Sequence, residues 1–391
     1  MKPHNSPKPH ARILLCAFLV LLSGCSSPPP RQASLESERL NPLGVEGLRY
    51  WDGDNENVSN YDILAEVLEF IDDKGANSHI HHLALSGGGV NGAFSAGILN
   101  GWSATETRPE FDVVSGISTG AIVSLFAYLG SDYDQQLRRY YTDTAPSEMF
   151  KLNSLFRVFS GNSLINTEGF EHKVRAAIDM PMLEQLAVER AKGRLLLIGT
   201  TSLDNEKLAI WDIGRIAQVG SAQAQTLIQD IVIASSSIPG AFPAKLISID
   251  DGQQHFDELH VDGGVSRQVF LIPQWLRYDQ HSGHLNQTIY VIRNGSLSPR
   301  YQVVSNDLKT ISSRSLSTLI RNQGIGDVEY IYFYSQHHGL DFQLAHIELD
   351  FDAEELDPHH LDYMRSLYDY GYHKALNQQL WLTQPPSIGQ Q

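Results

Sequence analysis

Short apolar runs alternate with longer amphipathic stretches from His82 onward. Four runs are rich in apolar or β-branched residues and end in small ones, which is typical of strands; they span residues 82–89, 111–118, 194–203 and 288–295. Between the first two, apolar residues recur at a spacing of four, which predicts a helix over 93–102. Strands that alternate with helices favour an α/β fold with a mostly parallel central sheet and helices on both faces.

Another apolar run lies near the N-terminus. Residues 13–22 form ten consecutive apolar positions behind three basic residues, too few to span a bilayer but typical of a signal peptide. The sequence Leu22-Ser23-Gly24-Cys25 follows, and it resembles the lipobox of bacterial lipoproteins, in which the Cys becomes the lipidated N-terminus. We expect residues 1–24 to be a lipoprotein signal peptide and Cys25 to carry the lipid; the alternative is an ordinary signal peptide.

The remainder is expected to contain one large domain. Residues 25–45 are rich in Ser, Pro and charge and predict a lipid-anchored flexible tether. Residues 46–382 are expected to form the domain, and residues 383–391 a disordered tail. The two cysteines, Cys16 and Cys25, both precede the domain, so none is left there for a disulfide or a metal. No metal-ligand motif is present, and we expect neither a metal nor a cofactor.

Charge narrows the range of partners. The chain has 391 residues and a formal net charge of −16; loss of residues 1–24, with three basic and no acidic side chains, makes it −19. Such a chain is repelled by phosphate backbones, which argues against nucleic-acid binding. Anionic lipid would repel it too, so the anchor is the expected route to a membrane. The oligomeric state cannot be read from the sequence.

A candidate nucleophile follows the second predicted strand. Gly116-Ile117-Ser118-Thr119-Gly120 has the form G-x-S-x-G, with an apolar strand before it and a helix-like run, 121–129, after it. This is the context of a nucleophile elbow, a sharp turn that exposes the Ser hydroxyl and needs glycine on both sides. The alternative is a Gly/Ser turn between two core elements.

A glycine-rich loop follows the first predicted strand. Gly87, Gly88, Gly89 and Gly92 stand at the start of the helix over 93–102, where backbone amides can converge on an anion. That anion could be a phosphate or the oxyanion formed when a carbonyl is attacked. A dinucleotide site is disfavoured because Asp112, at the right spacing, begins its strand instead of ending it. A P-loop is disfavoured because no Gly-Lys-Ser/Thr follows.

Asp262-Gly263-Gly264 follows a short segment, 258–261, and two glycines let the chain turn and leave the carboxylate exposed. By itself this is a weak signal for a site. Residues 234–243, rich in small residues and proline, favour a rigid loop over a helix.

Together these three motifs resemble the patatin-like phospholipase family, whose pattern is G-G-G-x-R-G, G-x-S-x-G and D-G-G/A in that order. The resemblance covers about residues 80–275 and includes the segment 234–243. It implies a variant of the α/β-hydrolase architecture and a Ser–Asp dyad without histidine. Ser118 would be the nucleophile and Asp262 its base, with Gly87, Gly88 and Gly89 as the oxyanion hole. Gly92, Gly116, Gly120, Gly263 and Gly264 would support these motifs.

One position departs from the family pattern, because Asn91 stands where the family has Arg. The backbone donors remain, but a positive charge near a lipid phosphate is missing. The histidines are expected mostly at the surface; His260, two residues before Asp262, is the one alternative third member of the site.

The expected function is hydrolysis of fatty acyl esters of membrane lipids by a lipoprotein. Ser26 after the Cys suggests the outer membrane of a Gram-negative cell, facing the periplasm. The alternatives are a thioesterase or small-ester esterase with the same dyad, and a lipoprotein that binds lipid or a partner without turnover.

Overall fold

The computed structural model describes residues 31–53, 65–66, 69–70, 73–75, 78–153, 163–250, 254–272, 286–351 and 360–389. The expected signal peptide, residues 1–24, and the expected lipidation residue Cys25 lie outside these ranges.

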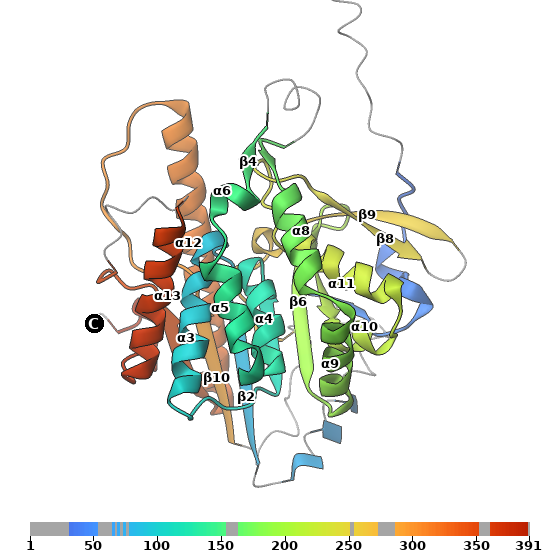
Figure 1. Ribbon diagram of the computed structural model, residues 1–391, viewed down its shortest axis with the longest axis horizontal. Helices are drawn as coiled ribbons and strands as arrows, with labels where there is room; N and C mark the ends of the chain where they lie inside the picture. Colours follow the sequence, from blue (N-terminus) through green and yellow to red (C-terminus); the bar gives the residue numbers. More distant parts are fainter. Residues whose placement is uncertain are drawn as a thin grey trace, which may run out of the picture.

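A central sheet of nine strands organises the molecule (Figure 1). Its order is β1-β7-β6-β3-β2-β10-β11, and β9 pairs with both β6 and β8. The five strands from β6 to β11 in this order run parallel, whereas β1, β7, β8 and β9 join through antiparallel pairs. The strands are β1 Arg49–Trp51, β2 His79–Leu85, β3 Val113–Ile117, β6 Leu195–Ser202, β7 Lys207–Asp212, β8 Lys245–Asp250, β9 His255–Asp262, β10 Asn286–Arg293 and β11 Asp341–His346; a separate hairpin joins β4 Lys151–Leu152 to β5 Ile165–Asn166.

Both faces of the sheet are covered, as the sequence predicts. Alternate residues of each strand point to opposite faces, so in β6 Leu196 and Ile198 join the core beneath most of the helices, while Leu195 and Leu197 join the core of the other face. On that second face, α12 packs its Val328 and Ile331 over β10. The helices are α3 Gly92–Ala104, α4 Thr119–Leu129, α5 Asp134–Thr142, α6 Pro146–Met149, α8 Glu168–Ala177, α9 Met180–Ala191, α10 Ile213–Gln218, α11 Ala222–Ser235, α12 Leu308–His338 and α13 Leu361–Leu376, with 3-10 turns at Ser37–Arg39, Pro42–Gly44, Gly89–Asn91, Ser131–Tyr133 and Gly263–Val265.

The predicted elements around the motifs are confirmed. β2, α3, β3, α4, β6 and β10 fall where the hydrophobic pattern places them, with ends that differ by a few residues. One local expectation is corrected: the segment 234–243 is not all loop, because Ala234 and Ser235 form the last residues of α11. Their side chains are buried, so packing against the domain keeps these two small residues in the helix.

Both ends of the described chain pack against the domain, in contrast to the expected tether and tail. Ser37 and Pro42 are buried, and Arg31 forms an ion pair with Asp204. Within the expected tail, Pro385 is buried and Ser387 Oγ donates a hydrogen bond to Glu329. Polar composition favoured unstructured segments, but the described residues of each make specific contacts with the domain surface.

Candidate active site

Ser118 occupies a strained turn at the carboxyl end of β3. Its φ is 55° and its ψ −124°, a left-handed conformation that L residues rarely adopt. The turn brings the backbone of Gly116 against that of Gly120, where a Cβ on Gly116 would lie 2.5 Å from the Gly120 carbonyl oxygen. The amide of Ser118 donates to Ser235 Oγ at 2.9 Å, and Ser235 Oγ donates to the Gly199 carbonyl at 2.7 Å. The last residue of α11 therefore fixes the elbow.

The register of β6 brings Asp262 to Ser118. β6 pairs first with β3, ending at Ile117 opposite Gly199, and then with β9, where Asp262 lies opposite Thr200. β3 ends its pairing with β6 at the elbow, and the end of β9 pairs with the next residues of β6. The Ser118 side chain lies close enough to the Asp262 carboxyl to favour its charged form, and the two residues are 4% and 6% exposed.

Burial makes Asp262 a base that titrates near neutrality. Loss of hydration raises the pKa of this carboxyl to about 7, although the hydrogen bond from the Gly264 amide (2.7 Å) and the nearby Ser118 hydroxyl lower it. A carboxylate with a raised pKa holds a proton more tightly than an exposed one. Asp262 is therefore suited to accept a proton from a hydroxyl at neutral pH.

Among the described histidines, none forms a hydrogen bond with Ser118 or Asp262. The expectation that the histidines lie mostly at the surface is wrong for His82 and His260. His260 is fully buried and forms its hydrogen bonds with Thr200 Oγ1 and Glu258 Oε2, each at 3.0 Å. Glu258 in turn forms a buried ion pair with Arg49, so the imidazole belongs to a polar network beside the sheet. His82, on strand β2, is buried and forms a hydrogen bond with Gln287 on β10.

The glycine-rich loop offers two amides rather than three. The Gly87 amide donates to the Gln268 carbonyl at 3.1 Å, so the expectation that Gly87 contributes to an oxyanion hole is not supported. Across the described ranges, no hydrogen bond from the amides of Gly88 or Gly89 to a protein acceptor is present. Gly89, at φ 59°, lies with Ser118 on the wall of the same pocket.

A buried arginine orients the loop. Arg293, at the end of β10, donates from Nη1 to the Gly87 carbonyl at 2.7 Å and to Ser86 Oγ at 3.0 Å. In a trans peptide the carbonyl and the next amide point in opposite directions, so this contact turns the Gly88 N–H away from Arg293. Burial lowers the pKa of Arg293 to about 10, which leaves the guanidinium charged at neutral pH.

Asn294 holds the other side of the same loop. Its Nδ2 donates to the Ser86 carbonyl at 2.9 Å, and its amide donates to Ser86 Oγ at 2.8 Å. The Gly88 backbone packs so closely on Asn294 that any side chain there would overlap it. Arg293 and Asn294 belong to no motif of the sequence; the signal that could have indicated them is their place at the end of a strand, beside β2 and its loop.

Asn91, which stands where the patatin-like pattern has arginine, ties the loop to α13. Its Oδ1 accepts from Tyr363 Oη at 2.8 Å, and its Nδ2 donates to the Asn294 carbonyl at 3.4 Å. The residue thus has a structural partner on a neighbouring helix.

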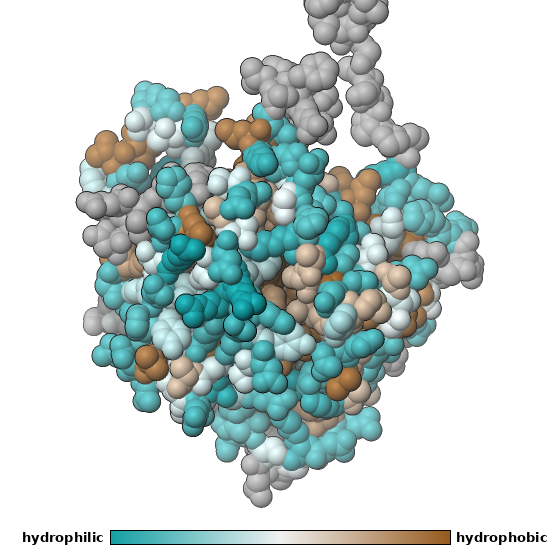
Figure 2. Space-filling view, in the orientation of Figure 1, coloured by the Kyte–Doolittle hydropathy of each residue, from teal (hydrophilic) through white to brown (hydrophobic). Residues whose placement is uncertain are grey.

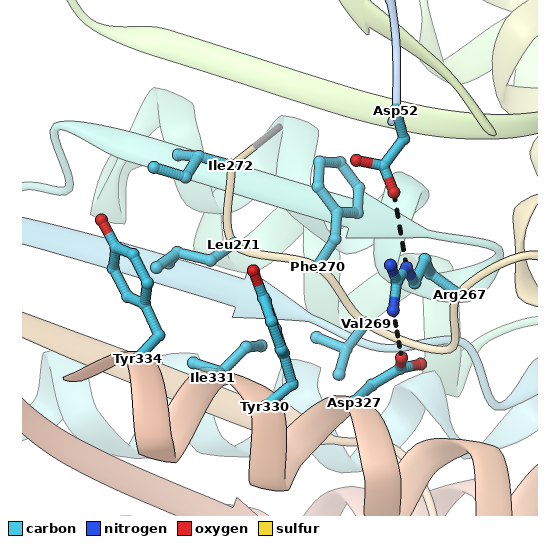
Figure 3. Close-up of a pocket in the computed structure, with 10 residues that line it drawn as sticks. All are labelled: Asp52, Arg267, Val269, Phe270, Leu271, Ile272, Asp327, Tyr330, Ile331 and Tyr334. Carbon is cyan, nitrogen blue, oxygen red and sulfur yellow. Dashed lines mark hydrogen bonds and ion pairs between the residues drawn. The ribbon is translucent and has the colours of Figure 1, made fainter. Parts of the chain in front are cut away.

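A polar cluster on the far side of the sheet supports Gln268, whose carbonyl accepts the hydrogen bond from the Gly87 amide. The Gln268 amide donates to Asp327 of α12 at 2.6 Å, and Arg267 lies between Asp327 and Asp52, 3.4 Å from each (Figure 3). The small pocket in Figure 3 is lined by apolar residues of the segment 269–272 and by Tyr330, Ile331 and Tyr334 of α12. This cluster buttresses the loop but does not face Ser118.

Ser118 opens onto an apolar cavity of ≈ 220 Å³. Its wall is formed mainly by aromatic and aliphatic side chains from several elements, with few polar groups. The apolar residues of the wall include Val90, Ile122, Met149, Phe150, Phe170, Ile238, Phe242 and Met364. Such a lining favours a hydrocarbon chain over a polar substrate group.

The described ranges contain no helix that is both long and apolar enough to cross a membrane. They also contain no cluster of His, Cys, Asp and Glu that could hold a metal ion.

Comparison with known proteins points to the family indicated by the motifs. Residues 83–273 match the model of the patatin-like phospholipase family. A cUMP-AMP-activated phospholipase from Escherichia coli is 35% identical over 94 residues, which cover 23% of this chain and only 29% of that relative. Among solved structures, VipD from Legionella pneumophila matches 77% of this chain and 67% of its own at 10% identity and a TM-score of 0.39. Human GIVD cytosolic phospholipase A2 matches 81% and 54% at 12% identity and a TM-score of 0.31.

Proposed function

We propose that this protein is a lipid acyl hydrolase that cleaves fatty acyl esters of membrane lipids with a Ser118–Asp262 dyad. The observation that carries the proposal is the close approach of a serine on a strained elbow to a buried carboxyl, beside an apolar cavity. The match of residues 83–273 to the patatin-like phospholipase family supports the same chemistry.

In the first half of the reaction, Ser118 Oγ attacks the ester carbonyl carbon while its proton passes to Asp262. The carbonyl oxygen becomes an oxyanion, which the Gly88 and Gly89 amides stabilise by hydrogen bonds. The C–O bond to the alcohol then breaks, and Asp262 returns the proton to the departing lysolipid. The acyl group stays on Ser118 as an ester.

In the second half, a water molecule attacks the acyl-enzyme and Asp262 accepts its proton. The bond to Ser118 breaks, Ser118 recovers its proton from Asp262, and the fatty acid leaves. The same carboxyl serves as base and acid in both halves, which requires a pKa near the working pH.

The lining of the cavity and the N-terminus indicate the substrate and its place. An apolar wall fits the acyl chain better than a small polar ester, and Asn91 gives no charge for a phosphate. With Cys25 lipidated, the enzyme would act on the membrane that holds it, the periplasmic face of the outer membrane of a Gram-negative cell.

The test is release of free fatty acid from mixed phospholipid vesicles by the wild type, Ser118→Ala and Asp262→Asn. Both variants preserve the shape of the site, and circular dichroism with thermal unfolding checks that they fold. We expect both to lose at least about 10³-fold in turnover. Wild-type protein that releases nothing from vesicles or from soluble esters would refute the hydrolase and favour a binding protein on this fold.

A further inference from the structure

The first half of α12 leaves the body of the molecule. No residue from 300 to 323 is buried, and Gly324 is the first buried position of this helix. In Figure 1 this end of α12 stands at the upper left, above the sheet. The second half, by contrast, packs Val328 and Ile331 against the sheet.

This projecting part carries large apolar side chains in water. Tyr301 is 91% exposed, Val303 79%, Leu308 84% and Leu319 67%. Leu308 and Leu319 are eleven residues apart, about three helical turns, so they share one face of α12. Exposed apolar groups that cluster in this way mark an interaction surface. Figure 2 shows brown side chains over this upper-left end.

The same segment is basic, although the chain as a whole has a net charge of −16. Residues 299–326 contain four basic side chains and one acidic, Asp307, which caps α12 through the Thr310 amide. The basic residues are Arg300, Lys309, Arg314 and Arg321. A helix with exposed leucines and flanking cations is typical of a surface that lies in the interface of an anionic membrane.

A second apolar projection lies on the same side. Leu152 of β4 is 87% exposed and Leu164, next to β5, is 53% exposed. In Figure 1, β4 and the projecting end of α12 both lie at the top, and α6 lies between them in this view. Pro146 and Met149 of α6 line the cavity beside Ser118. The cavity wall thus continues along the chain from α6 into β4, the strand that carries the exposed Leu152.

The N-terminal segment contacts the domain near the carboxyl ends of the parallel strands. Arg31 pairs with Asp204 and Gln32 bonds Asp257, both beside the carboxyl end of β6, where Ser118 also lies. Because residues 31–45 pack on the domain, only six residue steps separate Arg31 from Cys25, a reach of at most about 20 Å. A lipid on Cys25 would hold this edge close to the bilayer.

We propose that the first half of α12, with residues 300–307 and the exposed leucines beside β4 and β5, Leu152 and Leu164, is the docking surface for an anionic phospholipid bilayer. The apolar side chains enter the headgroup region and the cations pair with lipid phosphates. The surface delivers lipid to the cavity beside Ser118. This proposal rests on the proposed function for its choice of lipid as substrate, but the docking itself does not require turnover.

Docking is measured by sedimentation with vesicles of phosphatidylethanolamine and phosphatidylglycerol. The parent is the processed chain without its lipid, residues 26–391, carrying Ser118→Ala so that no lipid is consumed. We expect Leu308→Ser/Leu319→Ser and Lys309→Glu/Arg314→Glu each to weaken binding about tenfold or more. The matched controls are Val188→Ser/Val219→Ser, exposed by 50% and 36%, and Arg138→Glu/Arg139→Glu on α5.

Binding that is unchanged in the α12 variants, or reduced equally in the controls, would overturn the proposal. So would α12 variants that convert a dimer to a monomer in sedimentation velocity without a change in vesicle binding. That result would identify an interface between copies of the chain.

Turnover separates this proposal from the proposed function. In the active enzyme, the α12 variants should hydrolyse a soluble short-chain nitrophenyl ester at the wild-type rate but lose about tenfold in release of fatty acid from vesicles. Equal loss on both substrates would contradict a docking role. Wild-type protein that binds vesicles but cleaves neither substrate would refute the hydrolase and leave the docking surface intact.

Discussion

At the scale of single residues, we expect Asp262 to determine how the proposed active site responds to pH. It is the buried carboxyl beside Ser118, and His260, the neighbouring alternative, points into a separate network with Glu258. The pKa of Asp262 is raised to about 7 because burial disfavours its charged form. A dyad of this kind depends on a carboxyl that is desolvated enough to act as a base.

The first prediction concerns pH. Only the deprotonated form of Asp262 can accept the Ser118 proton, so kcat/KM should fall as the pH drops and reach half its maximum near pH 7. Hydrolysis of a soluble ester across about pH 5–9 measures the profile without vesicle effects. A half-maximum near pH 4, the range of an exposed carboxyl, would contradict the raised pKa.

The second prediction concerns Arg293, a positioning residue behind the oxyanion loop. Arg293→Met removes the donor that fixes the Gly87 carbonyl and should lower kcat by about tenfold to a hundredfold, with little change in KM, because donor alignment is lost. Arg293→Lys keeps a cation and should recover part of the rate. If both variants lose stability and leave the kcat of the folded fraction intact, the residue is structural only.

At the scale of elements, helix α13 completes the site by its fit against α3. Gly101 of α3 meets the Tyr372 backbone of α13, where a Cβ would lie 2.9 Å from the Tyr372 Cα. Gly371 of α13 allows a similar approach to the Phe94 carbonyl of α3. The close pairing of the helices brings Tyr363 to Asn91 and Met364 to the cavity.

The third prediction follows from that fit. Gly101→Leu forces α13 away from α3 and should lower the free energy of unfolding by about 1–3 kcal/mol or more. It should also slow hydrolysis of long-chain esters more than that of short ones, since the cavity wall at Met364 moves. Chemical denaturation and a chain-length series measure the two effects. Gly326→Leu, in α12 where no neighbour lies within 4 Å of a Cβ, is the matched control.

At the scale of the whole molecule, charge is unevenly placed. The chain has a formal net charge of −16, yet residues 308–326 of α12 contain three basic side chains and no acidic one. The net charge alone argues against binding to an anionic membrane. A local basic surface can nevertheless make the interaction attractive at short range.

The fourth prediction is that salt weakens vesicle binding but leaves the hydrolysis of a soluble ester unchanged. Vesicle binding by the unlipidated chain should weaken as ionic strength rises, because exposed charge pairs are screened over a Debye length of about 10 Å at 0.1 M. Hydrolysis of an uncharged soluble ester should stay nearly constant over the same range, since Ser118 and Asp262 are buried. Vesicle binding that strengthens with salt would mean that the acidic body dominates the approach.

The sequence by itself determined the local features of this protein. The periodicity of apolar residues predicted the strands and helices around the motifs because burial of one face imposes its period on the chain. The glycines beside Ser118 and Asp262 predicted two tight turns because only glycine tolerates such close backbone approach. These signals lie within a few neighbouring residues, so a single sequence suffices to recognise them.

The tertiary structure alone decided which groups meet. The register of β6 brings Asp262 to Ser118. The Gln268 carbonyl accepts a hydrogen bond from the Gly87 amide but none from the amides of Gly88 and Gly89. Burial of His260, the support from Arg293 and the exposure of α12 were likewise invisible in the sequence. All of these depend on contacts between segments far apart in the chain, which form only when the sheet is assembled and its two faces are covered.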